Sequence, residues 1–99
     1  MLHFPTKDCV EVLSDSADEL RRSIDEMSRL RASNFELTIS DVQTWVSAAL
    51  TDQNTCTDGF QEINAMENVK TVVRGRIVQV AQLTSNALAL INKLSTSHG

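Results

Sequence analysis

The strongest restriction on the fold comes from residues 42–58, where two different faces repeat with the period of an α-helix. At about 100° per residue, apolar or small side chains gather on one side of this helix and polar side chains on the other. The packing side carries Val42, Val46, Ala49, Gln53 and Cys56, and the polar side carries Thr44, Ser47, Thr51, Thr55 and Asp58. The first side is expected to pack against other helices, and the second to be available for contact.

Two further stretches have helical periodicity. One helix is predicted from about Lys7 to Leu30, and another over residues 69–94. The apolar face of the first consists of Val10, Leu13, Ala17, Leu20, Ile24 and Met27, and that of the last consists of Val69, Val73, Ile77, Val80, Thr84, Ala87, Ile91 and Leu94. Because strand patterns are absent, the three amphipathic helices predict an all-α, up-and-down helical bundle.

Local signals predict where the middle helix begins and ends. Residues 28–38 lose the helical period and are expected to form a connection. The pattern Ser40-Asp41-Val42-Gln43 is typical of a capping box, so the helix is predicted to begin at Ser40. Gly59 is a C-terminal signal, and a loop with a short helical turn is predicted for residues 60–68.

Two features of the last helix can be predicted in the same way. Gly75 lies within it and costs about 1 kcal/mol relative to alanine, so a close approach by a neighbouring helix is expected there. Residues 95–99 are predicted to form a frayed tail.

Size and charge exclude several classes of protein. The chain has 99 residues, enough for one domain, and 41% of them are hydrophobic. A formal net charge of −4 argues against a nucleic-acid partner, which requires a basic patch. No apolar run approaches the roughly 20 residues that a membrane span needs. The first residues also lack the pattern of a secretory signal peptide.

The sequence contains no arrangement suited to catalysis. His3 and His98 lie in the two tails, where no rigid neighbours can orient them, and there is no glycine-rich phosphate loop. We therefore expect a protein that binds rather than one that catalyses a reaction, with no catalytic residue and no cofactor.

An acidic stripe on the first helix has two interpretations. Glu11, Asp15 and Asp18 are separated by four and three residues, which places them on one side of the helix. They could attract a cationic surface, or they could be the solvated outer face of a bundle helix. A metal site is not expected, because no matching carboxylates lie on a second helical element.

The polar side of the middle helix is ambiguous in the same way. Threonine is a mediocre helix former, so its repetition on an outer face modestly favours a contact surface. Trp45 lies at the edge of the apolar face, where a packed position is favoured over an exposed one. Cys9 and Cys56 are either two buried free thiols or one disulfide, and the residues alone leave both open.

The segment from Trp45 to Phe60 closely resembles the third bundle helix of the plant invertase and pectin methylesterase inhibitor family. Residues 8–11 and 16–23 resemble its second helix, and residues 82–91 its last. The resemblance implies a four-helix bundle preceded by a helical hairpin. This chain begins just before the second helix, so residues 1–99 are expected to be an N-terminally truncated domain that retains three bundle helices.

The resemblance also implies a disulfide and a partner. The disulfide would join Cys9 to Cys56, and the protein would be extracellular, in the cell wall or apoplast, although this chain has no signal peptide. The partner would be pectin methylesterase, blocked at its substrate cleft in a 1:1 complex that regulates cell-wall pectin methylesterification. Carried over from the family, the enzyme-binding residues would be Glu11, Asp15, Asp18, Thr55 and Asp58.

Two alternatives to this function remain. Inhibitors of acid invertase share the fold but use a Pro-Lys-Phe segment after the third helix, and residues 60–70 here lack it. The chain could also be an inactive helical interaction module. Three helices would leave an apolar groove in place of the fourth, so we expect either self-association through that groove or reduced stability.

Overall fold

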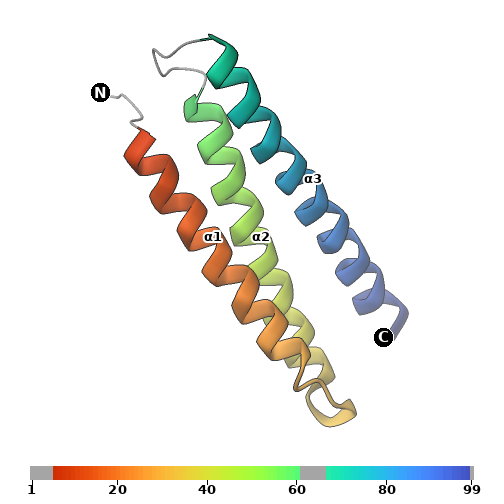
Figure 1. Cartoon of the computed structure of the whole chain (residues 1–99). Helices are drawn as coiled ribbons and strands as arrows, with labels where there is room; N and C mark the ends of the chain where they lie inside the picture. Colours follow the sequence, from red (N-terminus) through yellow and green to blue (C-terminus); the bar gives the residue numbers. More distant parts are fainter. Residues whose placement is uncertain (1–5, 61–66, 99) are drawn as a thin grey trace.

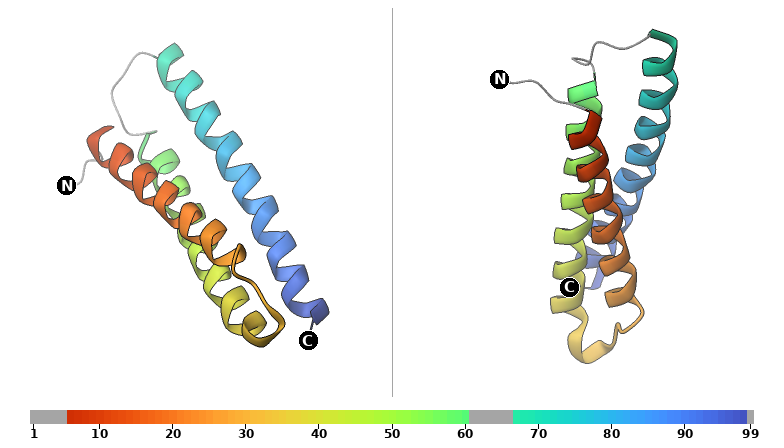
Figure 2. Two further views of the ribbon diagram at one scale, coloured as in Figure 1. Left: turned by 60° about the horizontal axis from the view of Figure 1, so that its bottom comes forward. Right: turned by 60° about the vertical axis from the view of Figure 1, so that its left-hand side comes forward.

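Three long α-helices lie side by side in the computed structural model, which describes residues 6–60 and 67–98 (Figure 1). They are α1 (Thr6–Met27), α2 (Phe35–Phe60) and α3 (Glu67–His98), with a short 3₁₀ helix, η1 (Ala32–Asn34), between the first two. No strand occurs among the described residues, and the predicted all-α fold is confirmed. Figure 2 shows the three helices from two further sides. α2 packs against both α1 and α3, whereas α1 and α3 make no close backbone contact with each other.

Small side chains on α1 face α2. Cys9, Ser16 and Ser23 are all buried, and their seven-residue spacing places them on one side of the helix. The fully buried Gln53 on α2 donates a hydrogen bond from Nε2 to the Ser16 hydroxyl at 3.2 Å. A disulfide joins Cys9 to Cys56, with 4.8 Å between the two Cα atoms. The short side chains and the covalent bond therefore hold α1 and α2 together as an antiparallel pair.

The core is aliphatic and centres on α2. The packing side predicted for this helix is confirmed, because all its members are buried: Val42, Val46, Ala49, Gln53 and Cys56. Ile77 on α3 packs against the disulfide, with Val12 and Leu13 of α1 beside it. This cluster is the point at which all three helices meet.

The beginning of α2 differs from the prediction. The helix starts at Phe35, and Ser40 lies inside it, where its carbonyl accepts a hydrogen bond from the Thr44 hydroxyl at 3.1 Å. Thr38 and Ile39, directly before the predicted cap, are 8% and 2% exposed, so the turn that precedes Ser40 is already partly buried. Burial of that turn outweighs the local capping signal. The connection is accordingly shorter than residues 28–38.

Other helix ends also differ. α1 stops at Met27 rather than Leu30, and the Asn34 side chain accepts from the Arg31 N–H at 2.8 Å to shape the turn that follows. Gly59 lies within α2, which continues to Phe60, and no described glycine has a positive φ. The capping role predicted for Gly59 is therefore wrong.

Two predictions about α3 are wrong. The helix continues to His98, so residues 95–98 are helical rather than frayed. No neighbouring atom lies within 4 Å of the position that a Gly75 Cβ would occupy, so no helix approaches closely there. Of the predicted loop over 60–68, the two ends are helical, and residues 61–66 lie outside the described residues, as does His3.

An apolar groove runs between α1 and α3, with α2 as its floor. It encloses about 370 Å³ and is lined by Leu20, Ser23, Ile24, Met27, Val42, Val46, Ala87 and Ile91. Part of the apolar seam predicted for α1, including Leu20 and Ile24, faces this groove, and Ile24 is 70% exposed. Leu13 of the same seam packs against the disulfide cluster, and Val10 is 62% exposed. The groove expected of a three-helix arrangement is therefore present.

Candidate binding surface on α1 and α2

The five predicted contact residues are all exposed on the first two helices. Glu11, Asp15 and Asp18 lie on α1, and Thr55 and Asp58 lie on α2. Their exposure means that they contribute little to the core and are accessible to a partner.

The disulfide brings most of these residues to one end of the α1–α2 pair. Glu11 is two residues from Cys9, whereas Thr55 is next to Cys56 and Asp58 is two residues beyond it. Since each residue turns a helix by about 100°, Glu11, Thr55 and Asp58 project away from the buried cysteines. They are therefore close to the disulfide in the sequence without facing it.

The other two acidic residues continue along α1. Asp15 and Asp18 are six and nine residues beyond Cys9, about 9 Å and 14 Å along the helix at 1.5 Å per residue. The three carboxylates of α1 thus follow one side of that helix, from near the disulfide to Asp18.

The acidic residues of this surface differ in their present partners. Asp18 Oδ1 accepts a hydrogen bond from Arg21 Nη1 at 2.8 Å, and both side chains are largely exposed. A solvent-exposed pair of this kind contributes only about 0–1 kcal/mol. Among the described side chains, Glu11, Asp15 and Asp58 form no ion pair. A cationic partner would meet these three carboxylates unopposed but would compete with Arg21 for Asp18.

Glu19 and Asp52 form a carboxyl pair that the sequence analysis missed. They come from α1 and α2, and Glu19 Oε1 is buried without a hydrogen-bond partner among the described residues. Burial, and then the neighbouring Asp52 carboxyl, raise the pKa of Glu19 from 4.5 to about 7, with Asp15 and Asp18 adding to the effect. Glu19 and Asp52 are 33 positions apart in the sequence, so only the alignment of α1 with α2 brings them together. No local sequence pattern indicates this contact.

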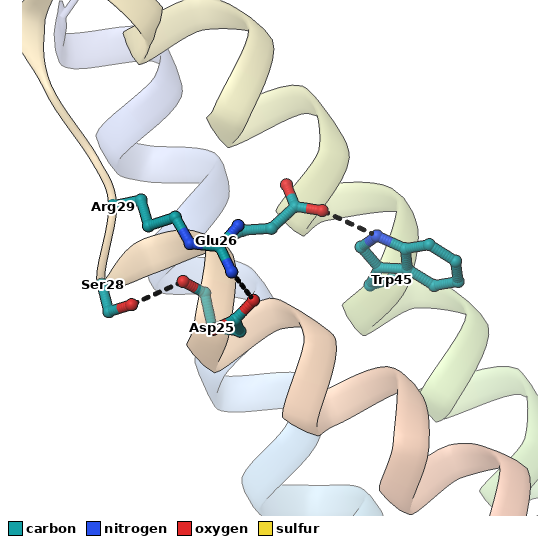
Figure 3. Close-up of polar contacts among 5 residues, drawn as sticks. All are labelled: Asp25, Glu26, Ser28, Arg29 and Trp45. Carbon is teal, nitrogen blue, oxygen red and sulfur yellow. Dashed lines mark hydrogen bonds and ion pairs between the residues drawn. The ribbon is translucent and has the colours of Figure 1, made fainter.

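Trp45 lies in the same seam between α1 and α2. Its indole Nε1–H points toward the Glu26 carboxylate and donates a hydrogen bond to Oε2 at 3.3 Å (Figure 3). The Arg22 guanidinium lies 4.9 Å from the centre of the ring. The side chain is half-buried, so it is neither a fully packed core residue nor a free aromatic anchor.

Two local contacts hold the C-terminal end of α1. Arg29 Nη2 donates to Asp25 Oδ2 at 2.5 Å, and the Ser28 hydroxyl donates to the Asp25 carbonyl at 2.6 Å (Figure 3). These contacts hold the turn after Met27.

The α1 side of this surface is acidic. Of the charged side chains within α1, seven are acidic and three are basic, a formal charge of −4. No group of three metal-binding side chains occurs in the described part of the chain. None of its helices is long and apolar enough to cross a membrane.

Comparison with known proteins identifies relatives of the chain. The sequence model of the plant invertase/pectin methylesterase inhibitor family matches residues 4–90. Pectinesterase inhibitor 9 of Arabidopsis thaliana is 50% identical over 93 residues, which cover 90% of this chain and 46% of that protein. The 21 kDa protein of Daucus carota is 47% identical over 94 residues, covering 92% of this chain and 49% of that protein.

A third relative, pectinesterase inhibitor 3 of Arabidopsis thaliana, is 45% identical over 97 residues. Those residues cover 93% of this chain and 47% of that protein, so the chain spans about half the length of these three relatives. No solved structure matches the chain. The family model and two of the three relatives are named for inhibition rather than catalysis. The match over residues 4–90 shows that the chain belongs to the plant invertase/pectin methylesterase inhibitor family.

Proposed function

We propose that the chain acts as a proteinaceous inhibitor of plant pectin methylesterase. The observation that carries the proposal is the 50% identity, over 90% of the chain, to a protein named a pectinesterase inhibitor. The inhibitor would cover the enzyme's substrate cleft in a 1:1 complex and so limit demethylesterification of cell-wall pectin. Such a mechanism requires a complementary surface and no reacting group.

The α1–α2 surface is our candidate for the enzyme-binding face. Its carboxylates would attract a basic surface and set the orientation of the complex. The disulfide supports this role because it fixes the positions of Glu11, Thr55 and Asp58 relative to one another. A surface that is already ordered loses less conformational entropy on binding. We assign the contacts to Glu11, Asp15, Asp18, Thr55 and Asp58.

The cell wall is the proposed location. The relatives' names refer to pectinesterase inhibitors, and a disulfide is typical of proteins exposed to an oxidising compartment.

An inhibition titration tests the function. Purified plant pectin methylesterase is titrated with the chain at mildly acidic pH, and loss of activity with a 1:1 end point is expected. The double variant Thr55→Ala/Asp58→Ala should weaken inhibition at least about tenfold if two contacts contribute 0.7 kcal/mol or more each. A matched control, Thr71→Ala/Glu36→Gln, removes one hydroxyl and one charge from exposed positions elsewhere and should inhibit like the parent chain.

Other results would redirect the proposal. Undiminished inhibition by the Thr55→Ala/Asp58→Ala variant would remove α2 from the contact surface. Because the family also includes invertase inhibitors, acid invertase is titrated in parallel. Activity loss in invertase alone would make that enzyme the target, and no effect on either enzyme would leave a helical interaction module.

A further inference from the structure

Arg22 is a basic residue on the acidic side of α1. Glu11, Asp15 and Asp18 precede it by eleven, seven and four residues, which places the three carboxylates within about 40° of Arg22 around the helix. The stripe of carboxylates is thus followed by a positive charge. Ile24, two residues beyond Arg22, lies on nearly the opposite side of α1 and lines the groove, so the Arg22 surface is separate from the groove.

Arg22 has an acidic neighbour at each spacing that permits a side-chain pair within a helix. The residues three and four positions before and after it are Asp18, Glu19, Asp25 and Glu26. Two of these carboxylates are paired with other arginines, Asp18 with Arg21 and Asp25 with Arg29. Each such pair has no net charge, which reduces the repulsion that an anionic group would meet on approaching Arg22.

The other two acidic neighbours are engaged with α2. Burial and the Asp52 carboxyl raise the pKa of Glu19 to about 7, which favours its neutral form. The Glu26 carboxylate accepts the Trp45 indole N–H at 3.3 Å (Figure 3). Among the described side chains Arg22 forms no ion pair, although four acidic residues lie at suitable spacings.

The Trp45 indole holds the Arg22 side chain instead. The guanidinium carbon lies 4.9 Å from the centre of the ring, within the range of a cation–π contact. Arg22 is exposed, whereas Trp45 is half-buried between α1 and α2. The contact uses the positive charge and leaves the guanidinium N–H donors available for a further acceptor. Because the side chain is already positioned, less conformational entropy is lost when that acceptor binds.

We propose that the Arg22 guanidinium, held over Trp45, binds a carboxylate of the inhibited enzyme and fixes the register of the complex. The inference rests on the proposed inhibition and adds one contact to its binding surface. A carboxylate is the matching group because the planar fork of N–H donors on arginine binds both of its oxygens at once.

The order of charges along α1 explains how this contact gives specificity. Arg22 lies seven residues beyond Asp15, about 10 Å along the helix. The enzyme would therefore present a basic group opposite Asp15 and an acidic group about 10 Å farther on. A shifted or reversed complex would bring like charges together, so only one register satisfies both contacts.

Inhibition titrations with arginine variants test the inference, using the enzyme that the parent chain inhibits. Arg22→Gln should raise the inhibition constant at least about tenfold, because a charge-assisted contact is lost. Arg22→Lys keeps the charge without the fork and should restore part of the inhibition. The matched control Arg74→Gln removes an exposed positive charge from α3 and should inhibit like the parent chain.

Salt separates a direct contact from a structural role. A contact between opposite charges is screened as ionic strength rises, so the difference between the parent chain and Arg22→Gln should shrink. Circular dichroism should show the same helical content for both proteins, because Arg22 is exposed. A difference that does not change with salt would assign Arg22 a structural role and overturn the inference.

The remaining outcomes distinguish this inference from the proposed function. If the parent chain inhibits and Arg22→Gln is equally potent, the inference is wrong and the proposed function stands. Equal weakening by Arg22→Gln and Arg74→Gln would also overturn it, because any lost positive charge would then have the same effect. A parent chain that inhibits neither pectin methylesterase nor invertase would overturn both proposals.

Discussion

Trp45 on α2 donates its indole N–H to the Glu26 carboxylate on α1, 3.3 Å away, while Arg22 lies 4.9 Å from the centre of the indole ring. The tryptophan thus joins two oppositely charged side chains of the neighbouring helix. This relationship connects α1 to α2 near the end opposite the disulfide.

Trp45→Phe separates the two contacts. It removes the donor and leaves a ring for Arg22, so the free energy of unfolding should fall by about 1 kcal/mol, measured by chemical denaturation. Glu26→Gln, which keeps an acceptor, should have a smaller effect. No change for Trp45→Phe would show that the hydrogen bond contributes nothing to stability.

Gly75→Ala should stabilise the chain. Gly75 is exposed in the interior of α3, and no neighbouring atom lies within 4 Å of the added Cβ. Alanine lowers the entropy of the unfolded chain, and the expected gain is about 0.5–1 kcal/mol. Thermal unfolding measures it. A lower melting temperature would instead indicate the close helix approach that the structure lacks.

Removal of the disulfide should destabilise the chain strongly. The double variant Cys9→Ser/Cys56→Ser opens a link across 47 residues, and the chain-entropy relation predicts a loss of about 4 kcal/mol. Denaturation of the parent chain with reductant should give a similar loss. The variant should not respond to reductant, and equal stability of oxidised and reduced parent would contradict the prediction.

Stability should fall as the pH rises from about 4.5 to about 7. The folded chain has a raised pKa of about 7 at Glu19 and still holds this proton where an unfolded glutamate has released it. The unfolded state therefore binds fewer protons in this window, and the free energy of unfolding decreases with pH.

Glu19→Gln tests the origin of this slope. The variant keeps the side chain neutral at every pH and should flatten the dependence, measured by denaturation across the window. Glu36→Gln, in the exposed first turn of α2, should retain it. A slope that survives Glu19→Gln would assign the effect to another group.

Asp15 and Asp18 should contribute unequally to binding of a basic enzyme surface. Asp15→Asn removes a carboxylate without an ion pair among the described side chains, whereas Asp18 is already paired with Arg21. We expect Asp15→Asn to slow association with pectin methylesterase more, in stopped-flow or surface-binding measurements at low salt. Arg21→Gln should accelerate association, and equal rates for all three variants would exclude α1 from the encounter.

The sequence predicts α2 best. Its packing side is correct because apolar periodicity reports burial directly when a helix lies between two neighbours. For α1 the same argument identifies the apolar face but not the neighbour that this face contacts. Ile24 in the apolar seam faces the groove, whereas Ser16 and Ser23 face α2. Periodicity alone cannot identify a packing contact made through small polar side chains.

The sequence predicts only part of the candidate surface. The outward positions of Glu11, Asp15 and Thr55 follow from helical geometry, and the structure places them on the surface. The contact between Glu19 and Asp52 depends on how α1 and α2 are aligned, which is a tertiary property. The helix-end signals at Ser40 and Gly59 failed. Packing of the residues before Ser40 extends α2 at its start, and the helix also continues past Gly59.

The covalent ring closed by Cys9 and Cys56 contains the turn and nearly all of α1 and α2, but α3 lies wholly outside it. The disulfide therefore links one wall of the groove to its floor, whereas α3, the opposite wall, is held by packing of Ile77 against the disulfide and by the hydrogen bond from Gln43 Nε2 to Asn92 Oδ1. Of the three helices, α1 and α2 are therefore joined covalently side by side, and α3 is not part of that ring. The position of α3 relative to α1 therefore depends on non-covalent contacts, whereas that of α2 is also fixed by a covalent bond.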